Sequence, residues 1–131
     1  MMNILVVIED NKGSLHRMSK EAIVGAQKLG GNITALVLGG NAEALAQELS
    51  SVQIEKTLVV DHDMISVYNS DGYTAVVSKT IQNTDPDIII VGHTYQTRDF
   101  MPRVSARLDI PFIPDIIMVD GDNYTKQVLN S

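Results

Sequence analysis

Residues 85–103 read DPDIIIVGHTYQTRDFMPR. Pro86 cannot continue a helix and restricts the residue before it, so we expect a helix to end here with Asp85 in extended geometry. Four β-branched residues, Ile88–Val91, follow without a polar interruption. Such a run is typical of a strand that is buried on both faces of a parallel sheet. Gly92 is expected to end this strand.

A polar turn and a helix are predicted after the strand. Asp99 and Pro102 indicate the first turn of that helix, because both residue types favour helix N-termini. In open parallel sheets, ligands bind at the carboxyl ends of the strands, beside helix N-termini. The residues expected there, and considered first for a binding site, are His93, Thr94, Gln96, Thr97 and Arg98.

The preceding chain alternates between strand-like and helix-like segments. Apolar runs predict strands over Asn3–Ile8, Ile33–Leu38 and Thr57–Val60. Helices are predicted between them from apolar residues at helical spacing, such as Ala22 and Ala26. This alternation predicts a single doubly wound, mostly parallel α/β domain over residues 1–131, with the first and fourth strands as central neighbours.

Helix caps and the last strand can also be placed from residue types. Asn41 is expected to cap one helix, and Ser70 or Asp71 the next. The final apolar run, 112–119, is interrupted by Pro114-Asp115, which indicates an edge strand, a bulge or the first residues of the strand. Residues 124–129 are expected to return as a short antiparallel strand.

Composition narrows the function classes. The chain has 131 residues, a formal net charge of −6 and no cysteine. The absence of cysteine excludes disulfides and thiolate metal sites. The negative net charge argues against a general nucleic-acid binder, because such a protein would need a basic face. The apolar run at the N-terminus is cut off by Glu9 and Asp10, well short of a signal core or membrane span. We expect a cytoplasmic protein without membrane insertion.

A search for catalytic and phosphate-binding motifs predicts no enzyme. The chain has no Gly-x-x-x-x-Gly-Lys-Ser/Thr, Gly-x-Gly-x-x-Gly or Gly-x-Ser-x-Gly motif. Gly39-Gly40 is better explained as a tight strand-to-helix turn than as an anion site. Asp61-His62-Asp63 is better explained as a solvated turn than as a metal cluster, since neighbouring side chains of an extended chain diverge. His93 lacks an evident partner acid and is most simply a hydrogen-bonded structural residue, and His16 receives no role.

Two arginines in the predicted helix have several possible roles. Arg98 and Arg103 can bind a phosphate or a carboxylate, or pair with Asp99 and Asp115. For Arg103, a structural pair or a subunit contact is the favoured interpretation. We expect Arg103 to matter for association or packing.

One segment carries a resemblance to a known family. It is the run Arg98-Asp99-Phe100-Met101-Pro102-Arg103-Val104-Ser105-Ala106-Arg107-Leu108. This run is similar to the basic-Asp-x-x-Pro-Arg-Val-x-x-x-Leu segment found in the N-terminal domain of the α subunit of electron transfer flavoproteins. The order and spacing of residues 4–9, 26–31 and 33–38 add to the likeness, so the chain resembles that domain over nearly its full length. Pro114-Asp115-Ile116 lies where the family usually has Ser-Asp-Val, and residues 93–97 replace small residues and a glycine.

The resemblance implies an adenine-nucleotide-hydrolase-like three-layer α/β sandwich and a heterodimer with a β subunit. In that family, dehydrogenase donors pass electrons to one FAD, which relays them to an acceptor. The FAD is held mainly by a C-terminal domain of the α subunit, and AMP, in some members, by the β subunit. Because the sequence ends at Ser131, we expect that FAD-binding domain to be absent, in a fragment or a short homologue. We therefore expect the chain alone not to hold FAD tightly, with His93, Thr94 and Arg98 as the candidate cofactor-binding residues.

Two other function classes remain as alternatives. One is an adenine-nucleotide-binding regulatory domain of the universal-stress type, which has the same topology. The Gly-x-x-Gly…Gly-Ser/Thr phosphate signature of that class is not present late in the chain. The other is a small hydrolase of related fold, which no motif here supports.

Overall fold

A central sheet organises the structure, which is a computed structural model describing residues 2–92, 94–110 and 116–118. The strand order is β5-β4-β1-β6-β7. The first four are parallel, and β7 pairs antiparallel with β6. The first and fourth long strands are therefore neighbours, as the sequence predicted. The strands span β1 (Asn3–Ile8), β4 (Asn32–Leu38), β5 (Lys56–Val60), β6 (Ile88–Val91) and β7 (Ile116–Met118).

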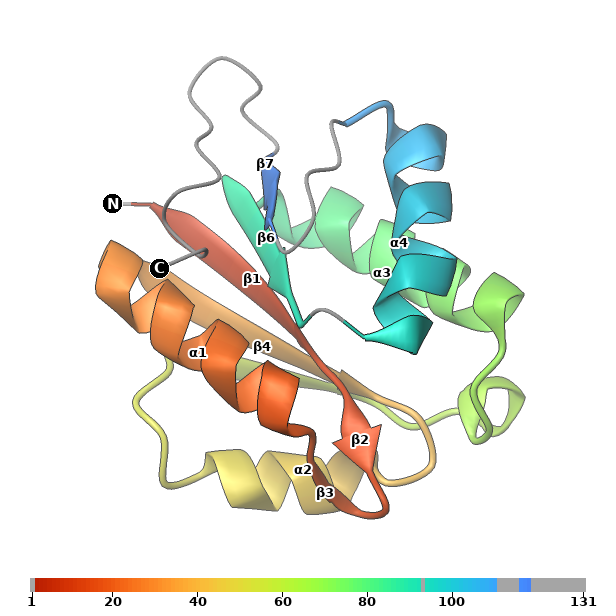
Figure 1. The fold of residues 1–131 in the computed structure, drawn as a ribbon, viewed down its shortest axis with the longest axis horizontal. Helices are drawn as coiled ribbons and strands as arrows, with labels where there is room; N and C mark the ends of the chain where they lie inside the picture. Colours follow the sequence, from red (N-terminus) through yellow and green to blue (C-terminus); the bar gives the residue numbers. More distant parts are fainter. Residues whose placement is uncertain (1, 93, 111–115, 119–131) are drawn as a thin grey trace.

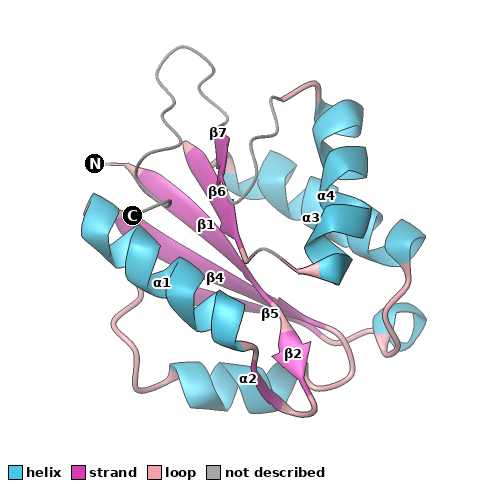
Figure 2. Cartoon of the chain, viewed as in Figure 1, coloured by secondary structure: helices cyan, strands magenta, loops and turns pink. Residues whose placement is uncertain are grey.

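Helices cover both faces of the sheet and complete three layers (Figures 1 and 2). One face is covered by α1 (Arg17–Leu29) and α2 (Ala42–Leu49). The other is covered by α3 (Ser70–Thr84) and α4 (Tyr95–Leu108). A small hairpin, β2 (Asp10–Asn11) and β3 (Ser14–Leu15), lies between β1 and α1, and a short 3₁₀ helix, η1 (Asp63–Ile65), follows β5. The predicted α/β class is confirmed.

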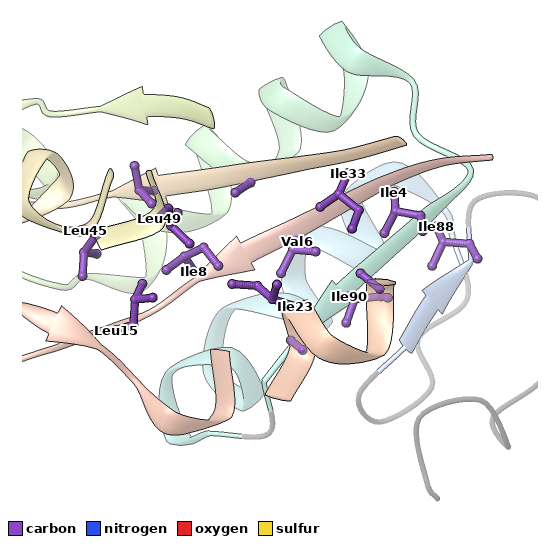
Figure 3. Close-up of a cluster of buried hydrophobic side chains, with 14 of the residues drawn as sticks. Ile4, Val6, Ile8, Leu15, Ile23, Ile33, Leu45, Leu49, Ile88 and Ile90 are labelled. Atoms are coloured by element: carbon purple, nitrogen blue, oxygen red, sulfur yellow. The ribbon is translucent and has the colours of Figure 1, made fainter. Parts of the chain in front are cut away.

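Alternation along β1 divides the interior into two cores. Successive side chains of a strand point to opposite faces. Figure 3 shows the core on the α1 and α2 side, where β1 contributes Ile4, Val6 and Ile8. The core on the other side receives Leu5 and Val7 from the same strand. All five side chains are at most 3% exposed, so β1 is buried on both faces like a central parallel strand.

The start of α4 differs from the prediction. Thr94, not Asp99, precedes the helix, and Pro102 lies inside it. Thr94 Oγ1 accepts from the Thr97 backbone N–H over 3.2 Å, while Thr97 Oγ1 accepts from the Thr94 N–H over 3.0 Å. This reciprocal cap stabilises a start that is one turn earlier than expected. An internal proline removes one helical hydrogen bond, and the buried residues Phe100, Met101 and Val104 hold the helix in place.

Both ends of α3 also correct the sequence prediction. The N-cap is Asn69 and not Ser70 or Asp71, because Asn69 Oδ1 accepts from the Gly72 N–H over 2.6 Å. At the other end, Asp85 has φ 48° and ψ 57°, which is left-handed and not extended. Its N–H donates to the Ile81 carbonyl over 2.9 Å and closes the helix. An aspartate tolerates this geometry, and the following proline disfavours only the right-handed helical region.

Two further expectations have mixed outcomes. Asn41 is at the N-cap position of α2, but its side chain does not cap the helix. It donates instead to Asp10 Oδ2 over 2.9 Å, which ties the β2–β3 hairpin to α2. Among the described strands, β7 is the last in the sheet order, which agrees with the edge position considered for the final apolar run. Pro114-Asp115 and the expected strand at 124–129 lie outside the described residues.

Among the described helices, none combines the length and the apolar character that crossing a membrane requires.

Candidate functional site

The carboxyl ends of β1 and β6 meet where the chain changes sides. β1 is followed by a helix on one face of the sheet and β6 by a helix on the other, so their ends form a topological switch point. A pocket of about 510 Å³ opens there. The described residues that line it come from the ends of both strands and from the starts of α1 and α4: Glu9, His16, Thr94, Tyr95, Gln96 and Arg98.

A carboxylate lines the pocket and contacts residues from both connections. The side chain of Glu9 is only 13% exposed. Its Oε1 accepts a hydrogen bond of 2.5 Å from the Thr94 hydroxyl, and its Oε2 lies 3.7 Å from His16 Nε2. The Glu9 backbone N–H donates to Ser19 Oγ over 2.7 Å. These contacts fix the carboxylate between the two connections.

His16 also shapes the pocket through the backbone. Its Nδ1 accepts from the Met18 N–H over 3.0 Å and so caps α1. Its own N–H donates to the Glu9 carbonyl over 3.0 Å. The two residues are thus held together although the β2–β3 hairpin separates them.

Residues on either side of position 93 are also held by specific contacts. Thr97 Oγ1 donates to the Gly92 carbonyl over 2.6 Å and is buried, at 4% exposure. Gly92 packs directly on α1, since a Cβ added there would lie 2.8 Å from the Cβ of Met18. The two amides that the reciprocal cap uses, those of Thr94 and Thr97, already have partners and are not available to hold an anion.

The predicted site residues fall into three groups. Thr94, Gln96 and Arg98 line the pocket, whereas Thr97 is buried and bonds to the Gly92 carbonyl. His93 and Asp115 lie outside the described residues. Arg103 is away from the pocket lining, and its Nη1 lies 3.2 Å from Asp71 Oδ1 on an exposed surface. A binding role for Thr94 or Arg98 stays a prediction.

Sequence reasoning missed Glu9 and His16. From the sequence, Glu9 is interpreted only as a residue that ends the apolar N-terminal run, and His16 receives no role. A usable signal was present, because an acid directly after a buried strand falls at the ligand edge of a parallel sheet. The partner of that acid, Thr94, is 85 positions away in the chain.

Two other segments that were weighed as possible sites have local structural roles. The side chain of His62 accepts from the Met64 N–H over 3.1 Å and caps η1, and no group of metal-binding side chains occurs among the described residues. Gly39 has φ 111°, and a Cβ there would lie 2.8 Å from the Tyr73 hydroxyl. Glycine is therefore required at Gly39 for the turn itself.

Two tyrosines beside the site have perturbed acidity. Burial, reinforced by a 2.6 Å hydrogen bond from the phenol to Asp99 Oδ2, raises the pKa of Tyr68 well above its usual value. Burial, and then the charges of Asp10 and Glu9, raise the pKa of Tyr73. The two rings contact edge to face with centroids 4.8 Å apart, and both lie against Phe100. Both phenols therefore stay protonated in the folded state over the neutral range.

The pocket offers chemically mixed groups. A ligand would meet a carboxylate at Glu9, an imidazole at His16, an amide at Gln96 and a guanidinium at Arg98. A pyrophosphate would be attracted by Arg98 but repelled by Glu9, and two amides at the helix start already have partners. Among the described lining residues, the Glu9 carboxylate therefore opposes the binding of a phosphate group.

Comparison with known proteins adds the family. A profile of the electron transfer flavoprotein domain matches residues 4–129. Electron transfer flavoprotein subunit alpha of Clostridium acetobutylicum is 31% identical over 130 residues, which cover 96% of this chain and 39% of that protein. The subunit of the same name from Bacillus subtilis is 31% identical over 118 residues, 88% of this chain and 36% of that protein.

A third relative has a different name. The acryloyl-CoA reductase electron transfer subunit beta of Anaerotignum propionicum is 31% identical over 124 residues, 92% of this chain and 34% of that protein. The chain thus spans 39% or less of the length of these three relatives. The match over residues 4–129, on a three-layer α/β structure, shows that this chain belongs to the electron transfer flavoprotein family.

Proposed function

We propose that this chain acts in FAD-dependent electron transfer as an α-subunit-type domain that contacts a β subunit. The observation that carries the proposal is the family match over residues 4–129. Relatives named as electron transfer flavoprotein subunit alpha support the α-type assignment. The role is that of an electron carrier subunit, with dehydrogenases as donors and a further protein as acceptor.

We further propose that residues 1–131 form one domain that does not hold FAD by itself. FAD supplies the redox chemistry of the family, because its ring accepts and donates electrons. Two features support the proposal that this domain does not hold FAD by itself. The Glu9 carboxylate lies in the pocket, and the amides of Thr94 and Thr97 already have hydrogen-bond partners. The domain contributes a rigid scaffold, with FAD held elsewhere in the complete assembly and AMP, where present, in the partner subunit.

The proposal is tested by mixing the purified chain with its cognate β subunit. We expect a heterodimer that survives gel filtration, and a measurable Kd by titration calorimetry. A β subunit that elutes separately at all concentrations would refute the subunit contact. Bovine serum albumin at the same concentration serves as the control for non-specific association.

The pocket at the switch point favours a second candidate, an adenine-nucleotide-binding regulatory domain. Nucleotides often bind at this position of doubly wound folds. The Glu9 carboxylate opposes a phosphate there, which is why this function is ranked second. Calorimetry with AMP, ADP and ATP discriminates between the two, because micromolar binding, about 8 kcal/mol, would favour the regulatory domain.

A further inference from the structure

The pocket at the switch point of the sheet contains charges of both signs. Among its described lining residues, Glu9 supplies a carboxylate and Arg98 a guanidinium, which carry opposite charges at neutral pH. The pocket volume of about 510 Å³ lies within the range of small-molecule sites in proteins. A small ligand that enters the pocket therefore meets an acid and a base together.

The Glu9 carboxylate keeps one oxygen for a further partner. Its side chain is 13% exposed, and its Oε1 already accepts from the Thr94 hydroxyl over 2.5 Å. Its Oε2 lies 3.7 Å from His16 Nε2, which is longer than a hydrogen bond. A carboxylate that is largely removed from water is costly unless it is paired. A ligand ammonium at Oε2 would form a charge-assisted hydrogen bond there.

The backbone sets the tautomer of His16. Its Nδ1 accepts from the Met18 N–H over 3.0 Å, so the neutral imidazole carries its proton on Nε2. Nε2 is the ring nitrogen that faces Glu9, and the His16 side chain is 30% exposed. His16 therefore presents a hydrogen-bond donor to the pocket and not an acceptor.

Two other acids near the pocket already have protein partners. Asp10, next to Glu9, accepts from the Gly13 N–H over 2.6 Å and from Asn41 Nδ2 over 2.9 Å. Asp99, next to Arg98, accepts from the Tyr68 hydroxyl over 2.6 Å. Neither aspartate is among the described residues that line the pocket. Glu9 is therefore the described acid that a ligand in the pocket meets.

Two other bases lie close in the sequence to the pocket residues. Lys12 is in the turn between β2 and β3, and Arg17 is the first residue of α1. Both are exposed, and neither is among the described lining residues. Arg98 is therefore the described guanidinium that a ligand meets. Its five N–H donors allow it to bind a ligand acceptor in addition to a partner within the protein.

This charge pattern discriminates among small ligands. An anion without a positive group is attracted by Arg98 and repelled by Glu9, and for a cation without a negative group the two effects are reversed. A ligand that carries both an ammonium and a carboxylate is complementary to both residues.

We propose that the switch-point pocket binds a small zwitterion of the α-amino-acid class. Glu9 binds the ligand's ammonium, and Arg98 together with the Nε2–H of His16 binds its carboxylate. Tyr95, which lines the pocket and is 90% exposed, offers its ring to the ligand's side chain. This ligand site is separate from the proposed contact with a β subunit and does not depend on it.

The first test is a screen of the full chain with the twenty common amino acids by thermal shift at about 10 mM. We expect at least one to bind with a Kd of about 1 mM or tighter by calorimetry, which corresponds to about 4.1 kcal/mol. The tightest binder is then compared with two analogues that each lack one charged group. For leucine these are 3-methylbutylamine and 4-methylpentanoate, and each should bind at least tenfold more weakly than the parent amino acid.

The second test exchanges the ligand preference by removing one charge. Glu9→Gln keeps an oxygen that can accept from the Thr94 hydroxyl, and it should bind the amino acid at least tenfold more weakly and the carboxylate analogue more tightly than wild type. Arg98→Gln should show the same loss with a gain for the amine analogue. A gain of binding cannot result from unfolding. The matched controls, Glu43→Gln on α2 and Arg107→Gln in the last turn of α4, replace exposed residues and should leave each Kd within about twofold of wild type.

Three results would overturn the proposal. One is that none of the twenty amino acids binds, and another is that an analogue with a single charged group binds as tightly as its parent. The third is that Glu9→Gln or Arg98→Gln binds the amino acid as tightly as wild type. AMP that binds to a chain which binds no amino acid would assign the pocket to the nucleotide alternative. The titration with the β subunit is a separate measurement, so failure of the amino-acid site and failure of the proposed function are distinguishable.

Discussion

The hydroxyl of Thr94 donates a hydrogen bond of 2.5 Å to the Glu9 carboxylate, across 85 positions of sequence. One end of this contact follows β1 and the other precedes α4. It therefore links the two connections that leave the sheet on opposite faces. The same hydroxyl accepts from the Thr97 N–H, so a single side chain both starts α4 and holds the acid of the pocket.

Replacing Thr94 by alanine should lower the free energy of unfolding by about 2 kcal/mol. The substitution removes a helix cap, worth about 1 kcal/mol, and a hydrogen bond to a charged acceptor, worth about as much. Thr94→Ser retains the oxygen and should stay within about 0.5 kcal/mol of wild type. Urea denaturation measures both, and an equal loss in both variants would assign the effect to the methyl group.

Alkaline pH should destabilise the fold through Tyr68. Because the folded state raises the pKa of Tyr68 above 10.0, unfolding there releases a proton, and the free energy of unfolding falls as pH rises through and above that value. Below it both states hold the proton and the contribution is constant. Tyr68→Phe should flatten part of this fall, measured by urea denaturation across the alkaline range. Tyr73, whose pKa is also raised, should account for part of the remainder.

Arg103→Lys should change the free energy of unfolding by less than about 0.5 kcal/mol. The arginine pairs with Asp71 over 3.2 Å, but the two side chains are 56% and 94% exposed, and such pairs contribute little. If Arg103 belongs to the subunit interface, the same substitution should weaken binding of the β subunit, because lysine loses the two-pronged geometry. Thermal melting and calorimetry separate the two. A large loss of stability would instead identify Arg103 as an internal clamp.

The purified chain should be colourless. The pocket at the switch point contains the Glu9 carboxylate, and two amides at the helix start are already hydrogen bonded. A visible absorbance spectrum after extensive dialysis against buffer containing no flavin checks this. Stoichiometric bound flavin in that spectrum would contradict the prediction. Glu9→Gln removes the negative charge. If the carboxylate is what repels phosphate-containing ligands, this variant should bind them more tightly than the wild-type chain does.

Most of the sheet could be predicted because burial on both faces leaves a continuous apolar run in the sequence. Residues 4–8 and Ile88–Val91 are such runs, and both are central strands. Their position as neighbours follows from the doubly wound topology, in which the strand order reverses between the first and fourth strands. The fold class could therefore be predicted from these apolar runs without knowledge of individual side-chain contacts.

The helix starts and half of the pocket could not be predicted in the same way. Asn69, Ser70 and Asp71 are three adjacent potential caps, and only the backbone path selects Asn69. Pro102 has the residue type of a first turn, yet the Thr94–Thr97 pair begins the helix earlier. These choices depend on hydrogen-bond geometry, which residue type alone does not determine.

The β2–β3 hairpin projects from the end of β1, so its length can change without altering the sheet. The chain leaves β1 at Glu9 and returns at His16, and the bond from the His16 N–H to the Glu9 carbonyl closes this excursion at its base. Its tip, Lys12 and Gly13, has φ values of 55° and 91°, and a Cβ on Gly13 would meet no atom within 4 Å. Extra residues inserted at this tip would lengthen a loop without moving either pocket residue. The tip is therefore a position at which a spectroscopic label or an affinity tag can be attached.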